Sequence, residues 1–236
     1  PEPILRQDGE TKNDCERNAA KRLLAKLHRD YPRLPLIIIE DALSANAPHI
    51  KELKRHKFRF ILGVKSGDHA YLFNEVAQAH NAGKTTEFEY VADGVIHRFR
   101  FLNDAPLNET NTDVRVNFLE YWEIKQDKIQ YFSWITDFTI TKNNAFDLMR
   151  GGRSRWKIEN ETFNTLKNQG YHIEHNYGHG RRHLSMNFFV LNLLAFYMHQ
   201  VFELTDRLYQ SCRLKVSSRK EYFSLLRHMF QMLLFR

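Results

Sequence analysis

Two acidic residues lie where their side chains could hold a divalent cation. Asp41 ends the strand-forming run "LPLIIIED", and α/β sheets bind their ligands at the carboxyl ends of such strands. Glu159 lies in "RWKIENETFNTLK". In that stretch Trp156, Phe163 and Leu166 form one apolar helical stripe, and the glutamate falls inside it. A carboxylate on a buried stripe is costly unless a cation or donor pairs with it, which predicts a specific role for Glu159.

Carboxylates in these places suit phosphodiester chemistry with divalent ions. Mg²⁺ takes oxygen ligands, and two ions need several carboxylates that converge from separate elements. The alternatives are structural. Asp41 could cap a helix that follows its strand. Glu159 could form an ion pair with Arg153 or Arg155 of the same turn, and Glu161 remains a minor rival for the catalytic position.

The elements around Asp41 alternate between helix and strand. Helical spacing runs from about 13 to 31, and the apolar run 36–40 predicts a strand covered on both faces. A short helix in "NAPHIKELKRHK" and a second buried strand in "FRFILGVKSGDH" follow. This order with short links indicates α/β architecture with parallel strands. Glu40 points to the opposite face of the strand from its neighbours in sequence and is interpreted as structural.

From about residue 84 the pattern becomes that of antiparallel hairpins. Alternating residues surround Asp93-Gly94, a strong two-residue hairpin signal, and a second hairpin turns near 126–128. We predict that Trp122, Tyr131 and Trp134 of this segment are core residues rather than surfaces for stacking bases.

Helical patterns return at about 142–150, resume at 154–168 and dominate from Ser185 to the end. The apolar stretch 188–202 is predicted to be a buried helix. No apolar run approaches the roughly 18 residues of a membrane span, and the first residues show neither a basic leader nor an apolar signal core. We therefore expect a cytoplasmic protein with no membrane partner.

The net charge of +7 favours a polyanionic partner. Basic residues recur beside aromatic ones, as in "HRFRF", "RGGRSRWK" and "GHGRRH". Phosphates attract Arg and Lys while splayed bases stack on flat rings, so this pattern favours nucleic acid over an anionic membrane surface. The two cysteines, Cys15 and Cys212, have no spacing typical of a zinc site or a disulfide framework.

Two stretches resemble a known family. "IIIEDALSANAPHIKELKRHKFRFILGVK" resembles the second-aspartate strand and following helix of the DDE transposases of bacterial insertion sequences. "RSRWKIENETFNTLKNQGYHIEHNYGHG" resembles their glutamate-bearing helix, and the resemblance covers about residues 12–200. It implies an α/β protein with an RNase H-like core, an antiparallel β insertion between the second Asp and the Glu, and C-terminal α-helices.

The resemblance also implies roles for individual residues. Asp41 and Glu159 would be catalytic and bind Mg²⁺, with Mn²⁺ as a substitute, for DNA strand cleavage and strand transfer at insertion-sequence ends. The family motif Y-x2-R-x3-E-x6-K is matched by Arg155 and Glu159. Gly152 stands in place of the tyrosine, and Lys167 follows Glu159 by eight residues instead of seven.

DNA phosphates are the expected ligands of the basic residues near these acids. Such residues follow the second strand, lie on the Glu helix and occupy the loop after it: Lys65, Arg155, Lys167, Arg181 and Arg182. His172, His175 and His179 lie in the same glycine-broken loop, and we interpret them as close to DNA rather than as a zinc site.

The family's first aspartate lies on the first strand of its core. Before Asp41 this chain has Asp8, Asp14 and Asp30, none of them on a predicted strand. We therefore expect a C-terminal portion of a transposase that lacks the first aspartate and is inactive alone, with Asp8 as the weaker alternative for that carboxylate. The expected domains are a partial RNase H-like core (1–83), the β insertion (84–135), the Glu helix with its basic loop (136–184) and C-terminal helices (185–236).

The expected partners are DNA, as transposon ends and target, and a second copy of the chain as a homodimer in a synaptic complex. An alternative of a different class is a non-catalytic DNA-binding module in which the acids are structural. A third alternative is a metal-dependent nuclease unrelated to transposition, for which the sequence shows no further ligands.

Overall fold

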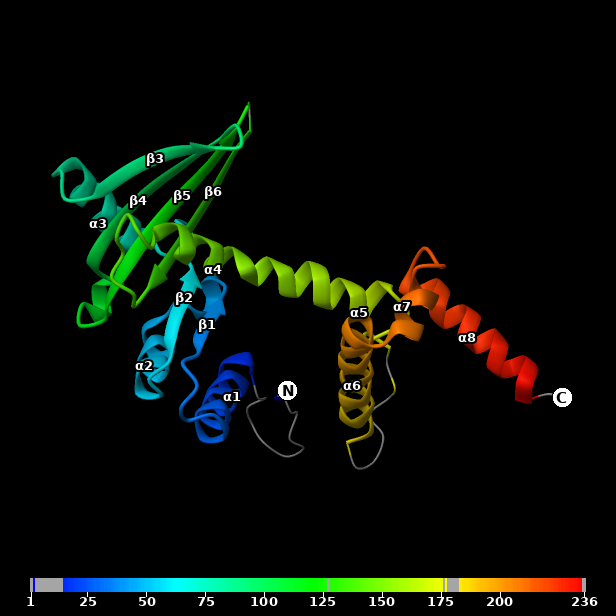
Figure 1. The fold of residues 1–236 in the computed structure, drawn as a ribbon. Coiled ribbons are helices and arrows are strands. Elements are labelled where there is room, and N and C mark those ends of the chain that lie inside the picture. The colour runs from blue at the N-terminus through cyan, green and yellow to red at the C-terminus, as the bar shows by residue number, and fades with distance from the viewer. Residues whose placement is uncertain (1, 3–14, 127, 176, 178–182, 235–236) are drawn as a thin grey trace. The chain divides into compact units, whose positions relative to one another are not determined.

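The computed structural model describes residues 2, 15–126, 128–175, 177 and 183–234. Its helices and strands form a mixed α/β fold (Figure 1). The chain divides into two compact units, Glu2–Arg155 and Trp156–Arg236, which are considered separately below. Several residues of interest lie outside the described part of the chain: Asp8, Asp14, His179, Arg181 and Arg182.

The first unit is built on one six-stranded sheet. The strands are β1 (Ile37–Glu40), β2 (Arg59–Gly63), β3 (Thr86–Ala92), β4 (Val95–Pro106), β5 (Arg115–Lys125) and β6 (Lys128–Thr136). Their order is β1-β2-β6-β5-β4-β3. β1 and β2 are parallel, and every other neighbouring pair is antiparallel. Because β6 pairs with β2, the predicted insertion continues the core sheet instead of forming a sheet of its own.

Helices connect these strands and cover the sheet. They are α1 (Glu16–Asp30), α2 (Ala47–Arg55), α3 (Ala70–Asn81) and α4 (Ala145–Lys157), with short 3-10 turns η1 (Ala42–Ser44) and η2 (Glu109–Asn111). α2 begins where the sequence favours it, because the Asn46 side chain accepts a hydrogen bond from the His49 amide at 3.1 Å and Pro48 lies in the first turn.

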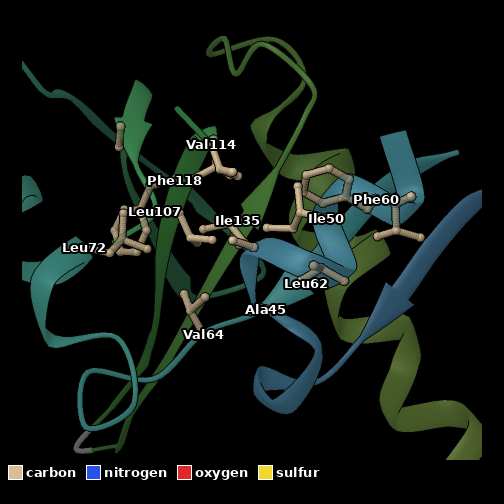
Figure 2. Close-up of a cluster of buried hydrophobic side chains, with 14 of the residues drawn as sticks. Ala45, Ile50, Phe60, Leu62, Val64, Leu72, Leu107, Val114, Phe118 and Ile135 are labelled. Carbon is tan, nitrogen blue, oxygen red and sulfur yellow. The ribbon is translucent and has the colours of Figure 1, made fainter. Parts of the chain in front are cut away.

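One face of the sheet packs against α2 and α3. Leu62, Phe118 and Ile135 on the strands form a buried cluster with Ile50 of α2 and Leu72 of α3. Figure 2 shows these side chains converging from the sheet and the two helices. Burial of such large apolar side chains contributes on the order of 2 kcal/mol each and fixes the parallel strand pair beneath the helices.

The other face of the sheet packs against α4. Ile61, Leu119 and Trp134 alternate with the residues of the first cluster and contact Leu148 and Met149 of the helix. The predicted core position of Trp134 is confirmed, since the residue is 6% exposed. α4 is therefore attached to the central strands of the sheet.

The first predicted hairpin is confirmed. β3 and β4 pair up to Ala92 and Val95, so Asp93 and Gly94 form a two-residue turn. Both have positive φ angles, 52° and 73°, as the tight hairpin turn requires.

Two burial predictions in this unit are wrong. β1 was expected to be covered on both faces, but it is an edge strand of the described sheet and its Ile37 is 47% exposed. Tyr131 was expected in the core, but it is 44% exposed, and its hydroxyl donates to Glu120 at 2.6 Å. β2, in contrast, is buried as predicted.

The second unit is helical. It contains a π-helical turn η3 (Ile158–Phe163), α5 (Asn164–Asn168), α6 (Leu184–Thr205), α7 (Arg207–Arg213) and α8 (Arg219–Leu234). A polar cluster joins α6 to its neighbours. The Tyr171 hydroxyl lies 2.8 Å from Nδ1 of His199, and Arg219 donates to Glu203 through Nε at 3.0 Å and Nη2 at 2.5 Å.

Burial and neighbouring charges shift the pKa values in this cluster. Burial lowers the pKa of His199, and the Arg219 guanidinium lowers it further. Burial alone would raise the pKa of Glu203, but the hydrogen bond and charge of Arg219 outweigh burial and hold that pKa below its usual value. Both shifts favour the unprotonated form of the side chain.

α6 is not the buried helix that its sequence predicted. None of its residues is buried, and Leu191, Tyr197 and Leu204 are 56%, 64% and 82% exposed. Its side chains are apolar on all sides, so the contacts of its own unit cover only part of its surface. In the described part of the chain it is the one helix long and apolar enough to cross a membrane, at 22 residues and mean hydropathy 1.3. A core helix meets the same criteria, so this is weak evidence for a membrane segment.

Candidate functional site

Asp41 lies directly after β1, at the carboxyl end of the parallel strand pair. It is exposed, and its Oδ1 accepts a hydrogen bond from the Leu43 amide at 3.1 Å, which caps η1. The structural alternative, a capping aspartate, is therefore present in the structure. Oδ2 has no hydrogen-bond or ion-pair partner among the described residues. Capping thus occupies one carboxylate oxygen and leaves the second able to bind a cation.

The end of β2 lies beside Asp41. Gly63 is the next residue after the Glu40–Leu62 pair, and a Cβ placed on it would be 3.7 Å from the Asp41 Cα. Lys65 follows two residues later and is exposed, so an acid and a base share the edge where a ligand of an α/β sheet binds.

His69 contacts both loops at this edge, the loop after β1 and the loop after β2. Its Nε2 lies 2.9 Å from the carbonyl oxygen of Ala45, in the loop after Asp41. The His69 amide donates to the Lys65 carbonyl at 3.0 Å, which closes the loop after β2. Sequence reasoning missed this histidine, because a single histidine before a helix carries no signal for a contact with a loop 24 residues away.

Glu40 has the structural role predicted for it. Its carboxylate lies 2.5 Å from Nε2 of His49, which is 9% exposed on α2. A buried polar side chain needs such a partner, so the pair holds α2 against β1 and leaves Asp41 as the exposed acid at the strand end.

The helix leading to Glu159 is continuous through its glycines. The sequence predicted a break between 150 and 154, but Gly151 and Gly152 lie inside α4. Both glycines face the sheet, where a Cβ on Gly152 would collide with the Trp134 ring and one on Gly151 would come within 2.8 Å of the Ile61 Cδ1, so the helix packs closely on the strands here. Tertiary packing therefore outweighs the weak helix propensity of glycine.

Arg153 of α4 fixes the helix to the insertion. It pairs with Glu123 of β5, and its guanidinium lies over the Phe132 ring, 4.8 Å from the centroid. Burial alone would raise the pKa of Glu123, but Arg153 lowers it below its usual value. The Tyr121 hydroxyl donates to Glu123 at 3.1 Å, and burial raises the pKa of that phenol. Arg153 is thus a packing residue, and Arg155, half-buried on the same helix, stays the predicted phosphate contact.

Glu159 lies in the π-helical turn and is exposed. The buried stripe predicted around it is wrong in most of its members. Trp156 and Phe163 are 61% and 47% exposed, whereas Leu166 is fully buried. The predicted stripe assumes the 100° per residue of a regular α-helix. The π turn between Trp156 and Leu166 changes the angles at which their side chains leave the helix axis. Glu159 is therefore an accessible carboxylate rather than a buried one.

Side chains support the backbone of the π turn. The Asn164 amide donates to the Glu159 carbonyl five residues earlier, as in a π-helix. Two further carbonyls receive side-chain bonds, Trp156 from Asn160 Nδ2 at 3.2 Å and Glu161 from Thr165 Oγ1 at 2.7 Å. The turn is thus a hydrogen-bonded feature of the sequence around Glu159.

The π turn explains the spacing of Lys167. In a regular helix a residue eight positions after Glu159 would point about 80° away from it. A π turn holds one extra residue, so Lys167 takes the place of the seventh residue, about 20° from Glu159. Lys167 is exposed and pairs with Glu174 at 2.7 Å. Leu166, the residue at the motif's spacing, is buried and could not contact DNA.

The histidine loop shows no metal site among the described residues, which contain no group of three potential ligands. The His175 amide donates to the His172 carbonyl at 2.9 Å, and the His175 ring packs on Tyr177, 4.7 Å between centroids. His179 and the predicted phosphate contacts Arg181 and Arg182 lie outside the described residues.

The structure thus combines a mixed α/β sheet, an exposed aspartate after its parallel strand pair and, later in the chain, a helix that carries an exposed glutamate. The family model described as Transposase DDE domain matches residues 2–197. The chain therefore belongs to the transposase DDE domain family, whose domain is RNase H-like and acts in DNA transposition. No curated protein matches the chain.

Proposed function

We propose that this chain supplies two of the three carboxylates of a transposase that cleaves DNA and transfers strands at insertion-sequence ends. Asp41 and Glu159 are those two carboxylates. The single observation that carries the proposal is the family match over residues 2–197, which includes both acids. In support, Asp41 lies at the carboxyl end of a parallel strand pair, the usual position of ligands in α/β sheets, and Glu159 is exposed on the helix that follows the insertion.

The donor atoms fit Mg²⁺, with Mn²⁺ as a substitute. Both residues offer hard carboxylate oxygens, and Asp41 keeps one oxygen beyond its capping bond. When bound, the ions would stabilise charge on the attacking and leaving oxygens of the phosphodiester. The role of Asp41 and Glu159 is to hold them and to offset their charge.

The basic residues bind and orient the DNA. Lys65 extends from the loop beside Asp41, and Lys167 from the face of the helix that carries Glu159. Arg155 completes the described set, and Arg181 and Arg182 are proposed from sequence alone. Contacts of this kind fix the register of a DNA strand without reading its bases.

The third carboxylate is proposed to come from outside the described residues. Asp30, the one earlier candidate that the structure describes, ends α1 and pairs with Arg29 at 2.9 Å. β1 has a neighbouring strand on one side only within the described sheet, so a further strand could add there. The proposed assembly is a homodimer that joins two transposon ends and target DNA in the cytoplasm. The proposed domains are the four predicted from the sequence: 1–83, 84–135, 136–184 and 185–236.

Metal binding tests the two carboxylates. Free Mn²⁺ is titrated by electron paramagnetic resonance against the whole chain and its Asp41→Asn, Glu159→Gln and double variants. Each single change is expected to weaken binding at least about five-fold. The double variant is expected to lose less than the sum of the two single losses, because the effects of ligands of one ion are not additive. Glu161→Gln is the matched control. An equal effect of the control, or additive losses, contradicts a shared site.

Activity tests the partial status of the chain. With Mg²⁺ or Mn²⁺ and DNA carrying the element's ends, the chain alone is expected to bind DNA without cleaving it. Robust cleavage by the chain alone would show that Asp8 or another acid completes the site. Full DNA binding by the Asp41→Asn/Glu159→Gln variant, together with no metal-dependent nicking in any assembly, would instead favour a non-catalytic DNA-binding module.

A further inference from the structure

The backbone carbonyls of the loop after β1 have two kinds of partner. Those of residues 41–44 accept hydrogen bonds from within the loop, at 2.8–3.3 Å, from the amides of Ser44, Ala45 and Asn46 and from the Asn46 side chain. The carbonyl of Ala45 has a partner from outside the loop, Nε2 of His69 at 2.9 Å. A carbonyl can only accept, so Nε2 carries the proton. Because Ala45 is 4% exposed, its carbonyl depends on this donor in place of water.

The loop after β2 is held at both of its ends. At its start the Val64 amide donates to the Ser133 carbonyl at 3.1 Å, and the Ser133 hydroxyl donates to the Val64 carbonyl at 2.9 Å. At its end the Lys65 carbonyl accepts from the amides of Asp68 and His69, at 3.1 and 3.0 Å. The turn that carries Lys65 therefore closes on the residue whose side chain contacts the other loop.

His69 occupies the N-cap position of α3 without capping it. Its side chain makes no cap hydrogen bond with that helix. Ser, Thr, Asp and Asn are the favoured residues at such positions, and Asp41 and Asn46 cap η1 and α2 in this way. The imidazole extends to Ala45 instead of capping α3. A role in holding the two loops therefore accounts for a histidine here better than a role in α3 does.

The two loops are anchored in the core by one apolar residue each. Ala45 and Val64, both 4% exposed, belong to the cluster that also contains Leu72 of α3 (Figure 2). Asp41 and Lys65, in contrast, are exposed. Their positions relative to one another therefore depend on the backbone of the two loops, which His69 joins.

We infer that His69 is a positioning residue for Asp41 and Lys65, the acid and the base at this edge of the sheet. Its imidazole fixes the loop after β1 to the loop after β2 and so keeps the two side chains at one edge. Every contact in this inference lies within the first unit. The inference rests on the proposed function, in which Asp41 binds a divalent ion and Lys65 a DNA phosphate, and it adds a residue that contacts neither ligand.

Hydrogen exchange tests the contact between the loops, whatever the loops bind. His69→Ser removes the donor to Ala45, while serine can cap α3. In the whole chain, mass spectrometry is expected to show at least about five-fold faster exchange of the amides of 43–46, which donate within the loop, but not of α3. His69→Gln, whose amide nitrogen can donate to the same carbonyl, is expected to recover at least half of the change. His80→Ser, the same change in the last turn of α3, is the matched control.

DNA and Mn²⁺ binding separate positioning from stability alone. At a temperature where every variant is folded, Lys65→Ala is expected to reduce the slope of log K for DNA against log salt by about 0.9. His69→Ser is expected to cause at least half of that reduction, and none in the Lys65→Ala background. It is also expected to weaken Mn²⁺ binding at least about three-fold, because groups that orient a ligand contribute to metal affinity. His69→Gln is expected to restore both properties.

The inference is overturned if His69→Ser leaves the salt slope or the Mn²⁺ affinity unchanged, if His80→Ser lowers them equally, or if His69→Gln recovers neither. A different result separates the inference from the proposed function. If Lys65→Ala and Asp41→Asn change neither DNA nor Mn²⁺ binding while His69→Ser still speeds exchange in 43–46, the proposed function fails and the contact between the loops stands.

Discussion

Replacement of Glu174 by glutamine is expected to strengthen DNA binding through Lys167. The two side chains pair at 2.7 Å, and 47% of the lysine side chain and 67% of the glutamate side chain are exposed. Exposed pairs of this kind are worth about 0.2–1 kcal/mol, which corresponds to a factor of about 1.4–5 in affinity. Glu174→Gln releases the lysine from this pair, so DNA affinity is expected to rise by up to about 5-fold at low salt.

The assay is fluorescence anisotropy of a labelled duplex titrated with the whole chain between about 50 and 200 mM salt. Each phosphate contact contributes about 0.9 to the slope of log K against log salt. Lys167→Ala is therefore expected to reduce that slope by about 0.9, and Glu174→Gln to have no effect in the Lys167→Ala background. Glu161→Gln is the matched control, because its side chain points away from Lys167 on the same helical stretch.

Two outcomes would refute the reasoning. If Lys167→Ala leaves the salt slope unchanged, the lysine does not contact phosphate and the register produced by the π turn has no role in binding. If Glu161→Gln strengthens binding as much as Glu174→Gln does, the gain comes from net charge alone and not from release of Lys167.

Three further results are expected. The melting temperature of the helical unit is expected to fall as pH drops from about 7 to 4, because His199 and Glu203 both have lowered pKa values and take up protons on unfolding. In the same titration His199→Gln should flatten the curve near pH 6 and Glu203→Gln near pH 4. Gly94→Ala is expected to cost about 1 kcal/mol in chemical denaturation, because its φ of 73° disfavours any side chain. Asn46→Ala is expected to cost a similar amount by removing the cap of α2.

Local patterns in the sequence predicted the elements that depend on nearby residues. The Asp93-Gly94 turn, the parallel strand pair and the place of Asp41 after β1 follow from turn chemistry and from runs of strand formers. Each of these signals lies within about ten residues of the feature it predicts, so no knowledge of tertiary contacts is needed.

Predictions failed where distant contacts decide the outcome. The apolar run of β1 is typical of a central strand, yet its neighbours place it at the sheet edge, and Ile37 is exposed. The glycine pair predicted a helix break, but the helix packs closely on Ile61 and Trp134, which lie far away in sequence, and the Trp134 ring leaves no room for a side chain at Gly152. The contact of His69 with the Ala45 carbonyl likewise has no local signal.

The number of residues between two positions does not by itself determine the angle between their side chains, as the helix with Glu159 shows. Lys167 fails the family spacing by one residue, which in a regular helix would turn its side chain about 80° from the glutamate. The structure contains one extra residue in the π turn, where the Thr165 side chain donates to the Glu161 carbonyl and the Asn160 side chain donates to the Trp156 carbonyl just before the turn. The extra residue in the motif spacing and the extra residue in the π turn therefore cancel, and Glu159 and Lys167 lie on the same face of the helix. At Gly152, where the motif has a tyrosine, the indole of Trp134 on β6 occupies the space that a side chain would need. At Lys167 the mismatch with the motif is offset by the π turn, so agreement with a motif is better judged by which helix face a residue lies on than by the number of residues between two positions.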